Sequence, residues 1–582
     1  MKRIGVAVLI ALSATLAACS GVPSSSAPET VEALDTAGAS AQVTKPPHLV
    51  DGDARQIVES FLGQNATTNS SHAIARAYLT SAANNRWSDE TATIVANEPT
   101  IGTFDTDKQT VTVLGRVLGT LTANGIYTPS LQGDGQGGER QPFVFHVVRL
   151  DNNQWRIDRL PPGLLLSEDQ FRDTYRQQVL YFYSLSEESL VPDLRWSALV
   201  DRVPWSEWLL TQLVEGPRQS IASAVSPDTM PAHVDPGRIT VQLGGTATLI
   251  EVPGSSQLDA GVRDRLAAQV SLTLVDALSG REMSITDGQV PVQIPRVAGT
   301  VFDASDFAAS IGPATPASEV YYLSGGRVRD DSGAPLDGPL GDGTYFLGSV
   351  AIGRPLPGGT DYAAGITGTG DSTQLQVGTV RDGLRPTQIR GALSRPAFAP
   401  GRPEVWIGGG SKLYRVTLDG SKPREYPVQI LSGGGQIVAV RFSPEGSRIA
   451  IVITGASGAT QLYIGTVVRG AGPVRVDGLQ PVSPVGVVVT DVAWLDAFKL
   501  FAIGYLASSQ DSRTFETGVD GTDWTNSTLG NLPDPPDSIT AATSANVWVS
   551  TVTGYVWELN GTSWVSPGTT GQTVGTQPVY LE

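Results

Sequence analysis

The most constraining feature of this sequence is the absence of helical periodicity from about residue 318 to residue 582. Short apolar runs alternate there with clusters of Gly, Pro, Asn and Asp, which is typical of many short strands joined by turns. The clearest example is residues 438–453, where the turn sequence FSPEGS separates two apolar strands. The pattern therefore predicts an all-β domain over residues 316–582.

The length of this segment also predicts its architecture. Division by a repeat of ~40–45 residues, the size of a four-stranded blade, gives about six units. The FSPEGS hairpin is similar to those in propeller blades of the TolB and WD-repeat kind, so we expect a β-propeller of about six blades. A sandwich or a pair of barrels is the alternative. Most tryptophans in the segment are expected to pack between strands, whereas Trp524 and Trp564 have polar neighbours and are expected at the surface, where aromatic rings bind sugars or protein partners.

The N-terminus has the organisation of an export signal. Lys2 and Arg3 precede an apolar stretch that ends in small residues, which predicts a signal peptide over residues 1–18. The stretch is too short to span a hydrocarbon core of about 30 Å. The sequence LAAC at residues 16–19 resembles the lipobox of bacterial lipoproteins. That resemblance implies that Cys19 carries a diacylglycerol with palmitate-type chains and begins the mature protein. An ordinary signal peptide with a chance cysteine is the alternative.

Cysteine content and charge both bear on how the chain meets the membrane. Cys19 is the only cysteine in 582 residues, so hydrophobic cores rather than disulfides must stabilise an exported chain. Without Lys2 and Arg3, 38 basic residues face 57 acidic ones, a net charge of −19. This charge argues against nucleic acid and against electrostatic attachment to anionic lipid. We therefore expect the acylated Cys19 to hold the protein on the extracytoplasmic face of the cell membrane, because two acyl chains suffice without a basic patch.

Two segments follow the signal. Residues 19–49 are rich in Ser, Ala and Pro and predict a flexible tether with a reach on the order of 30 Å. Residues 50–162 begin with two helical patterns and continue with a period of two, as antiparallel strands do. Two helices followed by a curved sheet are similar to nuclear-transport-factor-like cone domains. The apolar helix positions are Ile57, Val58, Phe61 and Leu62, then Ile74, Ala77, Tyr78 and Leu79.

A third segment, residues 175–297, mixes strands and helices. The patterns predict a strand at 179–183, a helix at 205–214 ended by Gly216-Pro217, and a helix at 259–278. In order and spacing the segment resembles the GerMN domain. The matching motifs are LYF at 180–182, LVP at 190–192 with Arg195, and LL at 209–210 with GP at 216–217. The predicted fold class is thus two α+β N-terminal domains, cone-like and GerMN-like, followed by an all-β propeller.

The sequence lacks the spacings of common catalytic and metal sites. The four histidines do not form H-E-x-x-H, and none of the six lysines lies three residues after a serine, as S-x-x-K enzymes require. The GDGQGG string at 133–138 has no helical pattern after it, so a loop is favoured over a dinucleotide site. Acidic clusters at 51–53, 105–107 and 330–331 lack the further ligands of a calcium loop. We expect no enzyme activity, metal or cofactor, although a carboxylate pair for glycoside hydrolysis, set by space rather than sequence, stays open.

The order of lipobox, tether, cone-like domain, GerMN-like domain and propeller resembles the LpqB family of actinobacterial lipoproteins over essentially the whole mature chain. The resemblance implies a non-catalytic accessory protein that associates with the extracytoplasmic part of the MtrB sensor kinase. It further implies a role for the MtrA–MtrB two-component system in envelope homeostasis, division and drug tolerance. Composition and spacing alone imply an anchored, acidic, multidomain binding protein. The alternative function is a lipoprotein that binds cell-wall glycan or a small ligand.

Overall fold

The computed structural model describes most of the chain after the tether. The described residues are 52–582 except 67–71, 90, 96–98, 132–138, 187–188, 227–229, 231–233, 312–318, 356–358, 419–421, 527–530 and 568–570. Cys19, the expected signal peptide, the whole of the expected tether and the GDGQGG string lie outside these residues. Within them, no helix combines the length and apolar character needed to cross a membrane.

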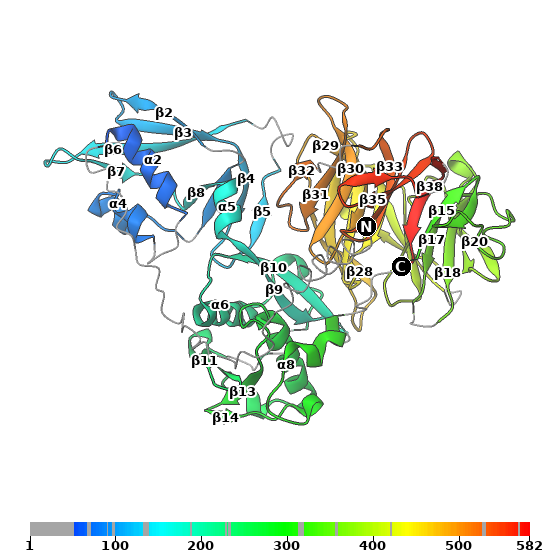
Figure 1. Cartoon of the computed structure of the whole chain (residues 1–582), viewed down its shortest axis with the longest axis horizontal. Helices are drawn as coiled ribbons and strands as arrows, with labels where there is room; N and C mark the ends of the chain where they lie inside the picture. Colours follow the sequence, from blue (N-terminus) through cyan, green and yellow to red (C-terminus); the bar gives the residue numbers. More distant parts are fainter. Residues whose placement is uncertain are drawn as a thin grey trace, which may run out of the picture. The chain divides into compact units, whose positions relative to one another are not determined.

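The first domain packs a helix on an antiparallel sheet (Figure 1). Helix α2 (Ala54–Gln64) begins with a capping box, in which the Asp53 and Gln56 side chains each accept the other residue's backbone N–H at 2.9 Å. Its predicted apolar face is buried. The strands form two sheets, β2-β3-β6-β7 and β5-β4-β1-β8. Their bounds, with those of helix α5, are β1 (Ala92–Val95), β2 (Thr100–Asp105), β3 (Thr110–Gly115), β4 (Val117–Leu121), β5 (Tyr127–Pro129), β6 (Gln141–Arg149), β7 (Trp155–Arg159), β8 (Leu164–Ser167) and α5 (Glu168–Thr174).

The second expected helix is instead two short helices, α3 (Ala73–Arg76) and α4 (Ser81–Arg86). Between them Leu79 forms a parallel bridge with Ile157 of β7. Thr80 then starts α4, because its hydroxyl accepts the Ala83 N–H at 3.1 Å. The prediction of one continuous helix was wrong because a 3.6-residue period does not register this contact with a distant strand.

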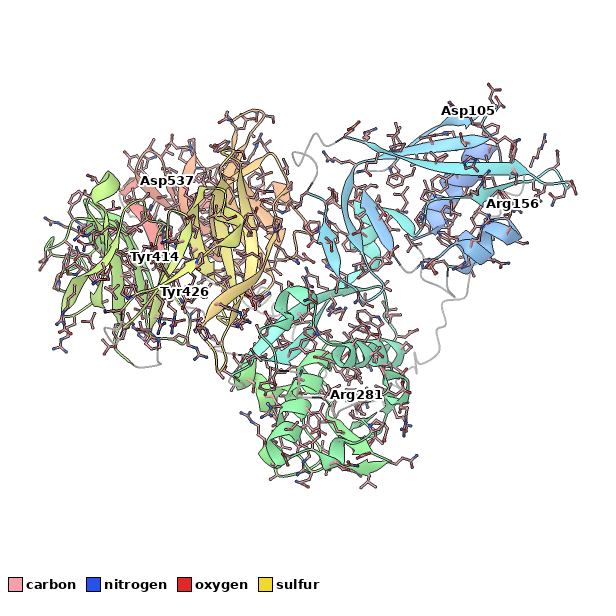
Figure 2. The ribbon with its side chains drawn as sticks, turned by 180° about the vertical axis from the view of Figure 1, so that it is seen from behind. Asp105, Arg156, Arg281, Tyr414, Tyr426 and Asp537 are labelled. Carbon is pink, nitrogen blue, oxygen red and sulfur yellow. The ribbon has the colours of Figure 1, made fainter. Side chains whose placement is uncertain are left out.

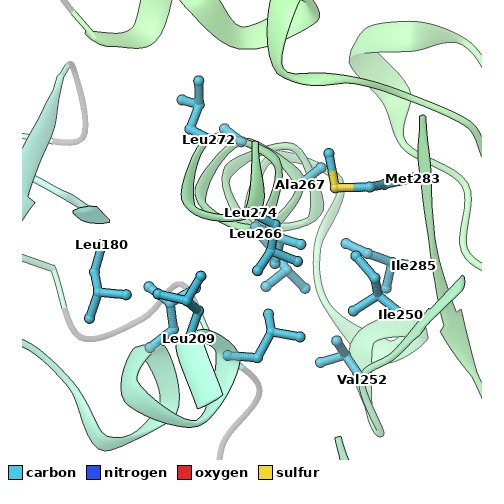
Figure 3. Close-up of a cluster of buried hydrophobic side chains, with 14 of the residues drawn as sticks. Leu180, Leu209, Ile250, Val252, Leu266, Ala267, Leu272, Leu274, Met283 and Ile285 are labelled. Atoms are coloured by element: carbon cyan, nitrogen blue, oxygen red, sulfur yellow. The ribbon is translucent and has the colours of Figure 1, made fainter. Parts of the chain in front are cut away.

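The second domain is also α+β. Its elements are β9 (Arg176–Tyr183), β10 (Leu190–Ser197), α6 (Arg202–Glu215), α7 (Gln219–Ala222), β11 (Thr240–Leu243), β12 (Thr248–Glu251), α8 (Ala260–Leu274), β13 (Met283–Asp287) and β14 (Val290–Pro291), with short 3₁₀ turns. Leu266 and Leu274 of α8 pack in one core with Leu209 of α6 and with β12 and β13 (Figure 3). Helix α8 also covers the edge of β9: Gln269 Nε2 donates to the Tyr181 carbonyl at 2.7 Å, and the Tyr181 N–H donates to Thr273 Oγ1 at 3.2 Å.

The C-terminal domain consists of six successive antiparallel sheets. Their innermost strands, β38, β17, β21, β25, β29 and β33, contact one another in that order, and β33 contacts β38 again. Strand β38 also pairs with β15, so the last strand completes the first sheet. The strands are β15 (Val320–Ser324), β16 (Arg327–Asp330), β17 (Leu347–Gly353), β18 (Tyr362–Thr367), β19 (Gln374–Thr379), β20 (Gly383–Arg390), β21 (Ala397–Phe398), β22 (Glu404–Gly409), β23 (Lys412–Thr417), β24 (Arg424–Pro427), β25 (Gly435–Phe442), β26 (Arg448–Gly455), β27 (Thr460–Val468), β28 (Arg475–Pro481), β29 (Val487–Trp494), β30 (Lys499–Leu506), β31 (Ser512–Gly518), β32 (Thr525–Asn526), β33 (Pro536–Thr543), β34 (Asn546–Thr551), β35 (Tyr555–Asn560), β36 (Ser563–Val565), β37 (Thr573–Val574) and β38 (Thr576–Tyr580). The predicted fold class, with a propeller of about six blades, is confirmed.

One aromatic residue lies where the sequence did not place it. Trp564 is only 2% exposed, packs in the core between two blades, and exchanges backbone hydrogen bonds with the Asn531 side chain at 2.8 and 3.1 Å. The expectation of a surface Trp564 was wrong because its polar neighbours point outward on a strand whose alternate residue points inward. Trp524 is half-buried, and its Nε1 donates to the Val482 carbonyl at 2.7 Å.

Candidate functional site

A charged cluster occupies the centre of the propeller. The Asp491 carboxylate on β29 accepts hydrogen bonds from Arg441 on β25 at 2.8 and 3.1 Å and from Arg395, just before β21, at 3.0 Å. It also accepts the Ile539 N–H at 3.1 Å and the Val492 N–H at 2.9 Å. The Asp491 side chain is 5% exposed. Burial of one acid with two arginines is tolerable only with this degree of pairing.

Arg395 joins four blades through one guanidinium group. Besides Asp491, its Nη1 donates to the Ile539 carbonyl of β33 at 3.3 Å, and its Nη2 donates to the Pro578 carbonyl of β38 at 2.7 Å. Burial, together with the nearby Arg441, lowers the pKa of Arg395 to about 10, so the side chain stays charged at neutral pH. The ring of blades is therefore held across its axis as well as by the β38–β15 pairing.

Two further carboxyl groups lie near this cluster. The Glu582 side chain accepts the Phe398 N–H, while its backbone N–H donates to the Ile352 carbonyl at 2.9 Å. Burial raises the pKa of Glu582 to about 7, although the Phe398 N–H and the two arginines oppose the shift. Asp537, labelled in Figure 2, lies on β33, and partial burial and the Asp491 charge raise its pKa.

The bonding of these acids determines what chemistry they can perform. A general base needs an unengaged lone pair within reach of a substrate proton. Asp491 accepts from two arginines and two backbone N–H groups, so it is saturated. The geometry therefore favours a structural cluster over the carboxylate pair of a hydrolase. Among the residues that the structure describes, no three His, Cys, Asp or Glu side chains gather to hold a metal ion.

A second buried charged cluster lies on strand β10. Asp193 is fully buried and pairs with Arg195 at 2.7 Å and with Arg218 Nε at 2.5 Å. Burial alone would raise the pKa of Asp193, but Arg218 and Arg195 hold it below its usual value. Arg195 Nη1 also donates to the carbonyl of Asn124 in the first domain at 2.9 Å. Arg195, singled out in the sequence only as part of a motif, thus binds an acid that the sequence analysis did not identify.

A cavity of about 50 Å³ adjoins this strand. Its walls include Tyr127 of the first domain, Pro192 and Arg218 of the second, and Arg448 and Asp520 of the propeller. At least ~10–15 Å³ is needed to hold one water molecule, so the cavity has room for a few waters but not for a cofactor. Its position marks a point where three domains meet.

The structure brings together residues that no motif connected in advance. The one predicted modification site, Cys19, lies outside the described residues and stays a prediction. A sequence signal for the central cluster did exist: Arg441 and Asp491 are each the single charged residue of an apolar strand. Such residues are seldom buried unless paired, so their isolation indicated partners without naming them.

Comparisons with known proteins identify the family. The model of the LpqB lipoprotein N-terminal domain matches residues 47–172, and the model of the LpqB β-propeller domain matches residues 325–580. The chain is 30% identical over 482 residues to lipoprotein LpqB of Mycobacterium bovis (strain BCG / Pasteur 1173P2), covering 77% of this chain and 78% of that protein. It is 26% identical over 486 residues to lipoprotein LpqB of Rhodococcus jostii (strain RHA1), covering 77% and 76%.

Solved structures are similar only in part. A TolB structure from Acinetobacter baumannii matches with a TM-score of 0.30 and 12% identity, covering 48% of this chain and 70% of TolB. A chain of a nidogen/laminin complex matches with a TM-score of 0.32 and 10% identity, covering 45% of this chain and 97% of that chain. Scores this low add nothing to the fold described above. On the strength of its sequence relatives, the chain belongs to the LpqB family of lipoproteins.

Proposed function

We propose that this protein is a lipid-anchored, extracytoplasmic accessory protein that modulates a membrane sensor kinase of the MtrB type, without catalysis of its own. The observation that carries the proposal is Cys19, the single cysteine of the chain, placed in LAAC after an apolar stretch in a member of a lipoprotein family. Envelope homeostasis and division are the processes in which we expect the protein to act.

The anchor accounts for how an acidic protein acts at a membrane. A body with a net charge of −19 gains nothing from anionic lipid, so acyl chains must supply the attachment. A tether with a reach on the order of 30 Å confines the body near the bilayer. Confinement raises the effective concentration toward a membrane-embedded partner, commonly to the millimolar range. Weak contacts with a sensor would then be sufficient.

The body itself is suited to binding. The Asp491 carboxylate at the centre of the propeller is saturated by hydrogen bonds, which favours a structural role for this cluster. Turns of the propeller are exposed, among them those at Thr369 and Ser509, and connecting loops commonly carry the binding residues of a rigid scaffold. These observations support a docking role rather than a hydrolase.

The anchor can be tested directly because the chain has one thiol. Cys19→Ala should move the protein from the membrane fraction to the soluble fraction and weaken signalling by the sensor, measured with a reporter of the response regulator. Ser24→Ala, in the same tether, is the matched control and should change neither. Intact-mass measurement of the mature wild type should show acyl mass on the peptide that begins at Cys19. Full signalling by a soluble Cys19→Ala protein would contradict the proposed mechanism.

Partner identity requires a separate experiment. In-cell cross-linking of the wild type and of Cys19→Ala, followed by mass spectrometry, should give links between the wild-type body and the extracytoplasmic part of a sensor kinase. Cys19→Ala should lose most of them. A body that instead binds purified peptidoglycan or arabinogalactan, without links to a kinase, would favour the glycan-binding alternative. That alternative has lost one expected surface aromatic, because Trp564 is buried.

A further inference from the structure

Strand β10 contributes to three hydrophobic cores. Leu190 and Val191 belong to the core of the second domain, and Leu194 is buried among propeller residues that include Val487. Trp196 belongs to the core of the first domain, with its ring 4.8 Å from that of Phe171. All eight residues of the strand are buried. One strand therefore lies within the packed interior of three domains.

Polar contacts fix the same strand to its neighbours. Trp196 Nε1 donates to Asp520 Oδ2, in the turn after β31 of the propeller, at 2.8 Å. The Trp196 N–H donates to the carbonyl of Gly125 in the first domain at 2.8 Å. The indole bond is buried and the amide bond joins two backbone groups of a buried strand, so competition from water weakens neither. The indole and amide of one residue thus connect the propeller and the first domain.

Two glycines of the propeller permit close backbone approach at this junction. Gly478 of β28 has φ of 64°, and a Cβ there would overlap the carbonyl oxygen of Ser220 in α7. Gly521 has φ of 82°, and a Cβ would lie 2.9 Å from the Pro129 ring. Only glycine adopts such conformations without cost. In addition, Arg172 of α5 pairs with Asp523 at 2.9 Å.

Domains within a chain move relative to one another by default, because their interfaces are usually small and polar. Here the link is a fully buried strand, β10, that packs into the cores of three domains. It carries Asp193 and Arg195, which form a buried cluster with Arg218. We propose that β10 holds the first domain, the second domain and the propeller together as one rigid body, because its side chains pack into the cores of all three. The propeller then presents one fixed face to a partner.

The single native cysteine makes this proposal testable by spin labelling. In the mature full-length chain with Cys19→Ala, the pair Asn152→Cys and Ser509→Cys labels exposed turns in the first domain and the propeller. The pair Thr369→Cys and Ser509→Cys labels exposed turns within the propeller and serves as the rigid reference. Double electron–electron resonance should give a distance distribution for the interdomain pair that is as narrow as the distribution for the reference pair. A broad or bimodal interdomain distribution would overturn the proposal.

A matched pair of glycine substitutions tests the junction itself. Gly478→Val places a side chain against Ser220 and should broaden the interdomain distribution while the reference pair stays narrow. Gly472 lies in the connection that leads into β28, with nothing within 4 Å of a Cβ, and Gly472→Val should leave both distributions unchanged. If Gly478→Val left the interdomain distribution unchanged as well, the proposed lock would be wrong. The reference pair distinguishes loss of the junction from unfolding of the propeller, because unfolding would broaden both.

Discussion

Asp491→Asn is the sharpest test of how the propeller is held together. The substitution keeps the size of the side chain and removes its charge. It leaves Arg395 and Arg441, whose side chains are 11% and 9% exposed, without a counter-charge at 3.0 and 2.8 Å. The new amide nitrogen would also face N–H donors, since the carboxylate oxygens accept from both arginines and from two backbone N–H groups.

The magnitude follows from the burial of this cluster. Removal of one partner of a buried ion pair costs about 3–5 kcal/mol, because the remaining charge stays buried and uncompensated. We expect Asp491→Asn to lower the free energy of unfolding by about that amount. Asp537→Asn is the matched control: Asp537 lies on β33 near the same cluster and is only partly covered, with more of its surface in water than Asp491, so its effect should stay within about 0.5 kcal/mol.

The free energy of unfolding of both variants is measured by urea-induced unfolding of the mature chain, followed by circular dichroism and tryptophan fluorescence. If the slope of the free energy of unfolding against urea concentration is the same in the variants as in the wild type, the same amount of surface is exposed on unfolding. If Asp491→Asn lost no more stability than Asp537→Asn, the cluster would not hold the blades, and the reasoning from its hydrogen bonds would fail. A double-mutant cycle with Arg395→Met should give a coupling energy well above zero.

Three further predictions concern single side chains. Because the pKa of Glu582 is raised to about 7 from an ordinary value near 4.5, the native state binds this proton more tightly than the unfolded state. The free energy of unfolding of the wild type should therefore fall as pH rises from about 4.5 to 7, and Glu582→Gln should lack this fall. Urea titrations at several pH values in that range measure both proteins, and an equal dependence on pH in the two would contradict the prediction. Trp564→Ala should cost about 3–5 kcal/mol as a core truncation, measured by thermal unfolding, and a neutral effect would restore its surface assignment. Thr80→Ala should cost about 1 kcal/mol through loss of the α4 cap, and Thr80→Ser should recover most of it.

Local patterns were read correctly where local physics decides the structure. The four apolar residues predicted for helix α2 lie on one buried face, because side-chain spacing within a helix acts over a few residues. The end of α6 at Gly216 follows from the Gly-Pro pair after it. The hairpin between β25 and β26 follows from a turn sequence between apolar strands. In each case the residues that matter are neighbours in the chain.

The errors have a common cause. Leu79 lies in a helical pattern but forms a bridge with Ile157, and Trp564 is buried in a core although its sequence neighbours are polar. In both cases a contact with residues distant in sequence outweighed local preference, as tertiary packing often does.

The sequence by itself determined the strand-and-turn character of the propeller, its approximate number of repeats and the amphipathic face of α2, and it predicts a lipid anchor at Cys19. These depend on hydrogen bonds, side-chain period and motifs that span a few residues. Only the tertiary structure decided that Asp491 meets Arg395 and that Trp196 meets Asp520, partners separated by 96 and 324 positions. Charged groups are seldom buried without a partner, and where these partners lie is set by the contacts around the ring of blades and by the packing of β10 into three cores.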